Sequence, residues 1–237
     1  MTEYSLHSEI KEWYRGSGDS LEVKVEDFIV DVIRGKLLIE IQTQNFSAVK
    51  KKLTKLLLNN QVRLVYPIAK LKWIVHTSTS VQFVRRRRSP KKGKVIDIFH
   101  ELVHIPRLVG NRNFSLEVLL IEEEEVRCSD GEGSWRRKGV SVKDRKLLNV
   151  FDRIVFRDSR DFLQFLPNDL HGNFTNKVVA SKLGIPIRLA QKITYCLRKM
   201  GAISVVGKKR NELLFQVSEL RVPSEELKLS PLNASEK

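Results

Sequence analysis

Cysteine is nearly absent from this chain, which has only Cys128 and Cys196 among its 237 residues. Two thiols cannot form the disulfide framework of a small secreted domain or a four-cysteine zinc site. Long apolar runs are missing too: no stretch approaches a membrane span, and the first residues, MTEYSLHSEIKEW, lack the apolar segment of a signal peptide. We therefore expect a cytoplasmic protein in a reducing compartment, with no membrane as its partner.

Acidic residues are missing from one long stretch. Between Ile41 and Ile96 the chain has fourteen Lys and Arg and no Asp or Glu, and the whole chain carries a net charge of +15. Solvated surfaces usually mix both signs, whereas a surface of one sign suits a phosphate backbone. We therefore expect DNA as the partner, and residues 85–94 are expected to form a flexible basic loop. The expected DNA contacts in this stretch are Lys50, Lys51, Lys52, Lys55, Arg85, Arg86, Arg87, Arg88, Lys91 and Lys92.

Residues 28–42, FIVDVIRGKLLIEIQ, predict a β-hairpin, because two β-branched runs flank Gly35-Lys36 and Gly suits the first position of a type II′ turn. Closing the hairpin there pairs residues whose numbers sum to 71, so Asp31 lies opposite Glu40, with Gln42 on the same face. Opposed carboxylates repel one another and need a cation or a proton. Both faces are mostly apolar, as in a covered sheet, so we expect Mg²⁺ (or Mn²⁺) there rather than a solvated acidic face.

One helix is expected before this hairpin in the sequence and one after it. Residues 3–15 carry an amphipathic stripe bordered by Glu9, and residues 46–58 form a second amphipathic helix with Asn45 as its N-cap. Apolar strands are expected at residues 21–25 and 62–68, with a further short one at 73–75.

This order of elements, with Asp31 on one strand and a Glu40-x-Gln42 pattern on the next, resembles the PD-(D/E)XK (restriction-endonuclease-like) nucleases over residues 1–80. The resemblance implies that Asp31 and Glu40 hold Mg²⁺, that Glu9 on the first helix lies near the metal, and that Gln42 fills the position usually held by a catalytic Lys. Because an amide carries no charge, Gln42 could only orient water or substrate by hydrogen bonds. The chain is also similar to an uncharacterised bacterial family with this core and a winged-helix tail.

Residues 81–158 are expected to form the basic loop and an accessory α/β region, in which residues 122–125 are a solvated acidic strand end. This region contains His100-Glu101-x-x-His104, which on a helix would place two imidazoles on one face, with Glu101 as the general base of a zinc protease. Pro106 limits that helix. Otherwise the two histidines are surface residues of an amphipathic helix.

Residues 159–220 change to a helical pattern followed by two strands, which resembles a winged helix-turn-helix domain. In such domains the second helix enters the major groove and the wing touches the backbone; a protein-docking role is the alternative. The expected DNA contacts here are Arg188, Gln191 and Lys192, beside Thr194 and Tyr195, and at the wing Lys208, Lys209 and Arg210. The polar tail, residues 221–237, is expected to be disordered.

Together these features predict an α+β protein, with a restriction-endonuclease-like α/β core around a mixed sheet followed by a winged helix-turn-helix domain. The first functional hypothesis is a metal-dependent DNA endonuclease. The second is a non-catalytic DNA-binding or regulatory protein with a decayed nuclease core, and the third is a zinc metalloprotease. Homodimer formation is left open.

Overall fold

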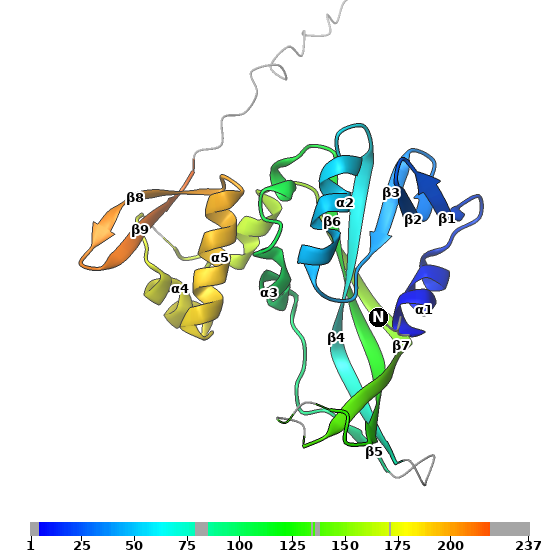
Figure 1. The fold of residues 1–237 in the computed structure, drawn as a ribbon. Helices are drawn as coiled ribbons and strands as arrows, with labels where there is room; N and C mark the ends of the chain where they lie inside the picture. The colour runs from blue at the N-terminus through cyan, green and yellow to red at the C-terminus, as the bar shows by residue number, and fades with distance from the viewer. Residues whose placement is uncertain (1–4, 79–84, 134, 136–137, 171, 219–237) are drawn as a thin grey trace, which may run out of the picture.

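The computed structural model describes residues 5–78, 85–133, 135, 138–170 and 172–218. They form an α+β fold with one mixed sheet, as expected (Figure 1). Three 3-10 turns lie at Val95–Ile98, Leu108–Gly110 and Asp161–Phe165. The helices and strands are α1 (Ser5–Tyr14), β1 (Ser20–Val25), β2 (Phe28–Arg34), β3 (Leu37–Ile41), α2 (Phe46–Leu56), β4 (Gln61–Ser78), β5 (Arg85–Arg88), α3 (Phe99–Leu102), β6 (Phe114–Ser129), β7 (Val140–Phe156), α4 (Asn176–Leu183), α5 (Ile187–Lys199), β8 (Ile203–Lys209) and β9 (Glu212–Val217).

The main sheet has seven strands in the order β1-β2-β3-β4-β6-β7, with β5 paired to β4 outside this path. The strands β1, β2 and β3 form an antiparallel meander, β3 and β6 lie parallel to β4, and β7 lies antiparallel to β6. A parallel pair needs a crossover connection, and α2 provides it between β3 and β4. Because β6 and β7 complete the same sheet, residues 81–158 extend the sheet of residues 1–80.

Three of the strands are unusually long, with 18 residues in β4, 16 in β6 and 17 in β7. Their ends run past the helices and form a projection that we call the arm, made of residues 71–78, 122–129 and 140–149 with β5 (Figure 1). The strands expected at 62–68 and 73–75 are therefore one strand, interrupted by a β-bulge between Ala69 and Leu71.

The prediction of a flexible loop at residues 85–94 is wrong for the first four of these residues. Arg85–Arg88 form β5, which pairs antiparallel with residues 73–76 of β4. The physical reason is that β3 accompanies β4 only as far as the pair Ile41↔Val65. Beyond that point one edge of β4 has free backbone donors and acceptors, and β5 satisfies them.

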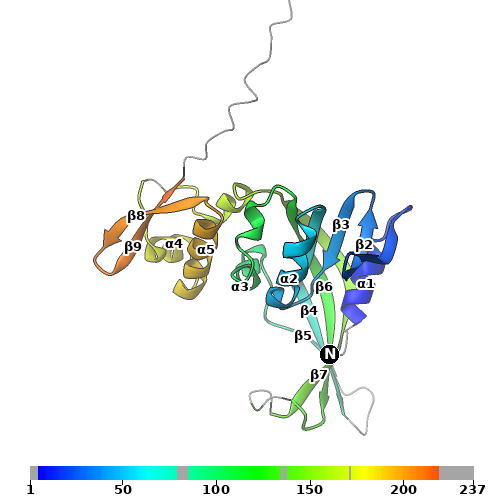
Figure 2. The same ribbon diagram turned by 45° about the horizontal axis from the view of Figure 1, so that its top comes forward.

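Each face of the sheet has its own apolar cluster. On one face α1 buries Leu6 and Ile10 against Val32, Ile39 and Ile41, whereas Trp13, which the amphipathic spacing also predicts as buried, is 43% exposed. The helices α2 and α3 lie on the other face (Figure 2). There α2 buries Phe46, Val49 and Leu53, which have the helical spacing of an amphipathic stripe, in a larger apolar cluster. The hairpin is thus covered on both sides, which confirms that its carboxylates lie in a covered sheet.

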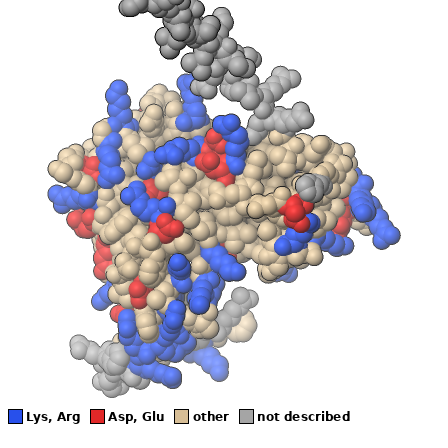
Figure 3. All heavy atoms as spheres, turned by 180° about the vertical axis from the view of Figure 1, so that it is seen from behind, with Lys and Arg blue, Asp and Glu red and all other residues tan. Residues whose placement is uncertain are grey.

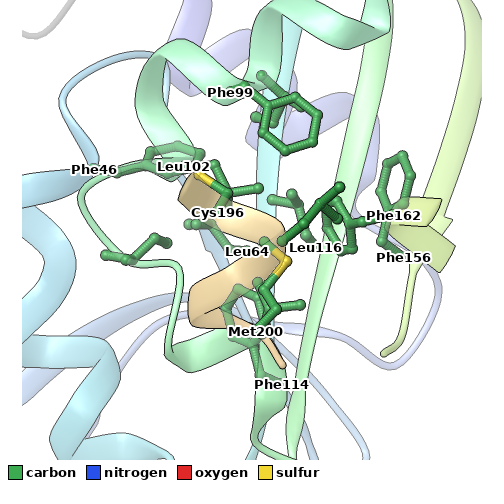
Figure 4. Packing of buried hydrophobic residues seen from close by; sticks show 14 of the residues in the cluster. Phe46, Leu64, Phe99, Leu102, Phe114, Leu116, Phe156, Phe162, Cys196 and Met200 are labelled. Carbon is green, nitrogen blue, oxygen red and sulfur yellow. The ribbon is translucent and has the colours of Figure 1, made fainter. Parts of the chain in front are cut away.

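The helices α4 and α5 and the β8–β9 hairpin form a C-terminal module that shares the larger cluster. Figure 4 shows Cys196 and Met200 of α5 packed beside Leu64, Leu102 and Phe114. One continuous core therefore crosses the expected boundary at residues 158/159. The expected disordered tail lies outside the described residues. In the described part of the chain no helix is long and apolar enough to cross a membrane.

Two local predictions are corrected by contacts that are distant in sequence. Asn45 has a left-handed backbone (φ 59°) and its side chain makes no cap bond; instead Glu101 Oε2 accepts the Phe46 N–H at 2.9 Å. Residues 122–125 are not a solvated strand end, because Glu123 is fully buried and Glu125 is 7% exposed. The register places Lys72 of β4 beside Glu123 of β6, so the acidic run pairs with basic residues inside the sheet.

Candidate active site

The β2–β3 hairpin has the predicted register. Its pairs are Val32↔Ile39, Ile33↔Leu38 and Arg34↔Leu37, whose numbers sum to 71. Of the two central residues only Gly35 has a positive φ, +57°, as a type II′ turn requires. The sequence therefore predicted the turn and the register of these three pairs correctly. The predicted direct pairing of Asp31 with Glu40 is not among the pairs formed.

The ladder between β2 and β3 opens after the pair Val32↔Ile39, and Asp31 lies where it opens. Asp31 Oδ2 accepts the Ile41 N–H at 2.8 Å, in place of a backbone acceptor. Val30 belongs to the α2-side cluster and Val32 to the α1-side cluster, although residues i and i+2 of a regular strand share a face. The chain therefore twists at Asp31 and directs this carboxylate into the gap between the strands.

His7 of α1 reaches the same gap. Its Nε2 lies 3.4 Å from Asp31 Oδ2 and 3.1 Å from the carbonyl oxygen of Ile41. Burial raises the pKa of Asp31, but hydrogen bonds from His7 and from the Ile41 N–H outweigh it and hold the pKa below its ordinary value. Asp31 is therefore a half-buried carboxylate that stays ionised at neutral pH.

Glu9, the residue predicted on this helix, lies elsewhere. Its carboxylate accepts the backbone N–H of Leu147 in β7. Residues two apart on a helix point to nearly opposite sides, so α1 cannot direct both His7 and Glu9 toward Asp31. Sequence reasoning found the correct helix and missed His7, for which amphipathic periodicity provided no signal.

Glu40 is buried on the α2 side of β3, with 7% of its surface exposed. Lys52 of α2 lies with its Nζ 2.5 Å from Glu40 Oε1, and the same ammonium donates to the carbonyl oxygen of Ile29. Burial, and next the negative charge of Asp31, raise the pKa of Glu40 to about 7 despite Lys52. Glu40 Oε2 is buried and has no hydrogen-bond partner among the described residues.

The side-chain amide of Gln42 does not face the carboxylates of Asp31 and Glu40. Its Nε2 donates to the carbonyl oxygens of Gln44 and Asn45, so the side chain holds the turn that precedes α2. The cation at the site comes from α2 as Lys52, which was predicted only as a phosphate contact. The sequence held a weak signal for this position, because Lys52 immediately precedes Leu53 of the buried stripe and so borders the face that packs on the sheet.

A divalent cation fits the carboxylate pair on charge and on acceptors. After His7 and Lys52 are counted, Glu40 still has a raised pKa and an unpartnered buried oxygen, so the site is short of positive charge. Within the described residues no three His, Cys, Asp or Glu side chains form a metal-binding group. Mg²⁺ commonly uses one or two carboxylates and completes its shell with water and phosphate oxygens, which is compatible with Asp31 and Glu40.

The residues of the His100-Glu101-x-x-His104 pattern do not lie on one helix. The helix α3 ends at Leu102, and His104 is an exposed residue of the following turn. Glu101 caps α2, and His100 Nδ1 lies 3.1 Å from Lys192 Nζ. The helix considered for the two histidines is thus a 3-10 turn, Val95–Ile98, and one short helical turn, Phe99–Leu102, and the carboxylate expected as a general base has a structural partner.

The basic residues predicted to contact DNA fall into two groups in the structure. Arg86 pairs with Glu124 at 2.7 Å and lies 4.1 Å from the Trp73 ring, and Lys55 pairs with Asp27 at 3.3 Å. Lys52 pairs with Glu40, as described above, and the others in the basic stretch are exposed or half-buried, with no acidic partner in the described part of the chain. This second group is Lys50, Lys51, Arg85, Arg87, Arg88, Lys91 and Lys92. Figure 3 shows Lys and Arg gathered over the arm.

The exposed face of α5 differs from the predicted one. Lys192 is half-buried and turned toward His100, and Thr194 is 2% exposed and donates to Asn176. The exposed positions repeat at helical spacing and form a set that we call the α5 stripe: Arg188, Gln191, Tyr195 and Arg198. The three predicted wing residues, Lys208, Lys209 and Arg210, are exposed at the β8–β9 turn.

Comparison with known proteins places the chain in a family. Residues 4–157 match the family described as Domain of unknown function (DUF8091). Over 216 residues the chain is 28% identical to an "Uncharacterized protein" of Treponema pallidum (strain Nichols). This alignment covers 90% of this chain and 85% of the relative. No solved structure matches the chain significantly. Because the matched region is well over half of the sequence and contains the whole main sheet, this chain belongs to the DUF8091 family.

Proposed function

We propose that this protein is a metal-dependent DNA endonuclease with its reaction centre at Asp31, Glu40 and Lys52. The observation that carries the proposal is the unpartnered, buried Glu40 Oε2 beside an ammonium group and the charge of a second, half-buried carboxylate, Asp31. That combination is suited to a divalent cation and a phosphate. The hairpin, the α2 crossover and the parallel strand β4 support a restriction-endonuclease-like core, and the two helices followed by a β-hairpin support a winged helix.

Each of these residues has a different chemical role in the proposed reaction, and its charge determines that role. Asp31 and Glu40 would hold Mg²⁺ (or Mn²⁺), which when bound polarises a phosphate and lowers the pKa of water. His7 and the Ile41 N–H fix the Asp31 carboxylate in one orientation. Lys52 Nζ places a positive charge where a scissile phosphate would gain negative charge, a role that the neutral Gln42 cannot perform.

DNA binding would use surfaces outside this centre. The unpaired cations of α2, β5 and the loop after β5 suit phosphates, which position a protein without reading sequence. The α5 stripe combines two arginines with an amide and a phenol, the kinds of side chain that contact base edges. The wing residues would contact the backbone beside it.

The decisive experiment incubates labelled duplex, branched and single-stranded DNA with the full chain and Mg²⁺, Mn²⁺ or EDTA. We expect cleavage that depends on the metal, and a loss of about 100-fold or more in Asp31→Ala and Glu40→Ala. DNA affinity in EDTA should stay within about twofold, since each metal-ligand variant leaves the basic surface intact. Glu12→Ala, which removes an exposed carboxylate of α1, is the matched control and should cleave normally.

The second candidate is a non-catalytic DNA-binding protein, and one observation favours it. Each carboxylate already has a cationic or proton-donating partner in the chain, His7 for Asp31 and Lys52 for Glu40, while the Gln42 amide is used in a turn. Parent protein that binds DNA and never cleaves any of the three shapes with either metal would replace the first proposal with this one.

A further inference from the structure

A second candidate site lies at the base of the arm. It is a cavity of 430 Å³ between the base of the arm and the segment that follows β5. Its walls include Tyr66 and Pro67 of β4, Lys91 and Gly93 of the segment after β5, and Arg127 and Arg145 of the arm. Thr43 and Gln44, which directly follow Gln42 in the chain, also line the cavity.

The cavity is built from a buried ionic network. Lys72 Nζ lies 2.6 Å from Glu123 Oε1 and 3.0 Å from Glu125 Oε2. Arg145 pairs with Glu123 at 2.5 Å, and Arg127 pairs with Glu125 at 2.6 Å. A buried ionic network is weak evidence for stability, since apolar residues of similar size often serve as well. Its position on a cavity wall suggests a role in binding.

The segment that carries Lys91 is held firmly against the sheet. The Ser89 N–H donates to the Lys72 carbonyl oxygen and the Gly93 N–H to the Ala69 carbonyl oxygen, both at 2.8 Å. A Cβ at Gly93 would lie 2.7 Å from that Ala69 oxygen, so only glycine allows this approach. Lys91 is exposed and has no acidic partner among the described residues.

Cationic side chains outnumber carboxylates on the walls of this cavity. The carboxylates of Glu123 and Glu125 bind Lys72 and the two arginines, and Asp97 accepts the Lys94 N–H. Four cations against three carboxylates leave one net positive charge on the walls. Burial raises the pKa of Tyr66 to about 12, so its phenol stays protonated, and its hydroxyl has no hydrogen-bond partner in the described part. A ligand rich in acceptor oxygens suits such walls.

We propose that this cavity binds one nucleoside phosphate unit, with the phosphate at Lys91 and Arg127 and the base against Tyr66 and Pro67. The volume lies in the range of small-molecule sites, which combine apolar walls with a few convergent polar groups. The unit is either a free mononucleotide or one nucleotide of a strand. The second source rests on the proposed nuclease function, because Thr43 and Gln44 of the cavity wall closely follow β3, the strand that carries Glu40.

The test is calorimetric titration of the full chain in EDTA with deoxyadenosine 5′-monophosphate, deoxyadenosine and inorganic phosphate. We expect the monophosphate to bind at least tenfold more tightly than either of the other two, because it alone satisfies both walls. Lys91→Ala should weaken that binding about fivefold or more, and Tyr66→Phe should weaken it as well. Lys24→Ala, an exposed cation of β1 outside both the cavity and the proposed DNA surface, is the matched control and should bind as the parent does.

These variants avoid the buried ionic network, whose disruption would leave an unpaired charge and destabilise the fold. Equal binding of deoxyadenosine and its monophosphate, no binding of the monophosphate, or Lys91→Ala protein that binds as the parent does would each overturn the proposal. Displacement of bound monophosphate by a single-stranded oligonucleotide identifies a strand as the source, and its absence identifies the free nucleotide. Binding that persists in protein without nuclease activity separates this site from the proposed function.

Discussion

At the scale of single residues, the two carboxylates of the hairpin have opposite titration behaviour. Hydrogen bonds from His7 and Ile41 hold the pKa of Asp31 low, whereas burial and the charge of Asp31 raise the pKa of Glu40 to about 7. Pairs of titratable groups whose environments separate their pKa values are typical of active sites. Near neutral pH the pair therefore carries between one and two negative charges.

Glu40 should make the stability of the metal-free protein depend on pH. Its folded pKa is raised above the ordinary value of 4.5, so between pH 4.5 and about 7 the folded state binds more protons than the unfolded state. Stability should therefore fall as the pH rises through this window, by on the order of 2–3 kcal/mol. Glu40→Gln should remove this loss, which urea denaturation in EDTA at pH 5 and pH 8 would measure. A difference between the two proteins that is equal at both pH values would contradict the prediction.

Lys52 should matter to cleavage far more than its neighbours on α2. We expect Lys52→Ala to lower the cleavage rate by about 100-fold, since a charge that stabilises the transition state is lost, and Lys52→Arg to retain part of the activity. Lys52→Ala should also move the pH-dependent loss of stability to higher pH, because the ammonium lowers the pKa of Glu40. Lys24→Ala, a change at an exposed cation of β1 outside the proposed DNA surface, should leave both measurements unchanged.

At the scale of elements, the four arginines of β5 differ in whether they have an acidic partner. Arg86 is bound by Glu124 and lies over Trp73, whereas Arg85, Arg87 and Arg88 have no acidic partner in the described chain. Replacing these three with Ala should weaken binding to all DNA alike. The slope of log affinity against log salt should flatten by up to about 2.7, at about 0.9 for each lost phosphate contact.

Arg86→Ala is the matched comparison for this strand, and we expect it to leave the salt slope nearly unchanged. An equal change in slope for Arg86→Ala and for the triple variant would show that the pairing with Glu124 does not decide which arginines reach DNA. An unchanged slope in the triple variant would show that β5 does not touch phosphate.

At the scale of the whole molecule, the C-terminal module is part of the core. Cys196 and Met200 of α5 pack against Leu102 and Phe114, and the cluster continues into the main sheet (Figure 4). Deleting residues 159–237 would expose this apolar surface to water, so we expect protein that is insoluble or melts at a clearly lower temperature. A soluble truncated chain with the melting temperature of the parent would contradict this.

The α5 stripe offers a way to test DNA reading without disturbing the core. Combined Arg188→Ala and Gln191→Ala changes are both on exposed positions, so melting should be unaffected. We expect these variants to lose preference among DNA sequences or shapes while retaining salt-sensitive non-specific binding. The measure is affinity for a set of competing DNA ligands; Lys192→Ala, on the half-buried face, should keep the preference of the parent.

The sequence by itself determined the features that depend on near neighbours. Turn chemistry at Gly35 and alternation in the strands were sufficient for the hairpin register, and helical spacing was sufficient for the buried stripes of α1 and α2. Such features are encoded within a few residues, because strand and helix periods act locally. The α+β class with a mixed sheet follows from the order of these elements.

Only the tertiary structure decided which side chains meet. His7 reaches Asp31 from another element, Glu101 caps α2 from 55 residues away, and Lys52 replaces the charge that Gln42 lacks. The counter-charges of the basic stretch come from β6, where Glu123 lies beside Lys72. These contacts depend on strand order, on the twist at Asp31 and on helix rotation, which are properties of the assembled sheet, and no periodic pattern in the sequence records them.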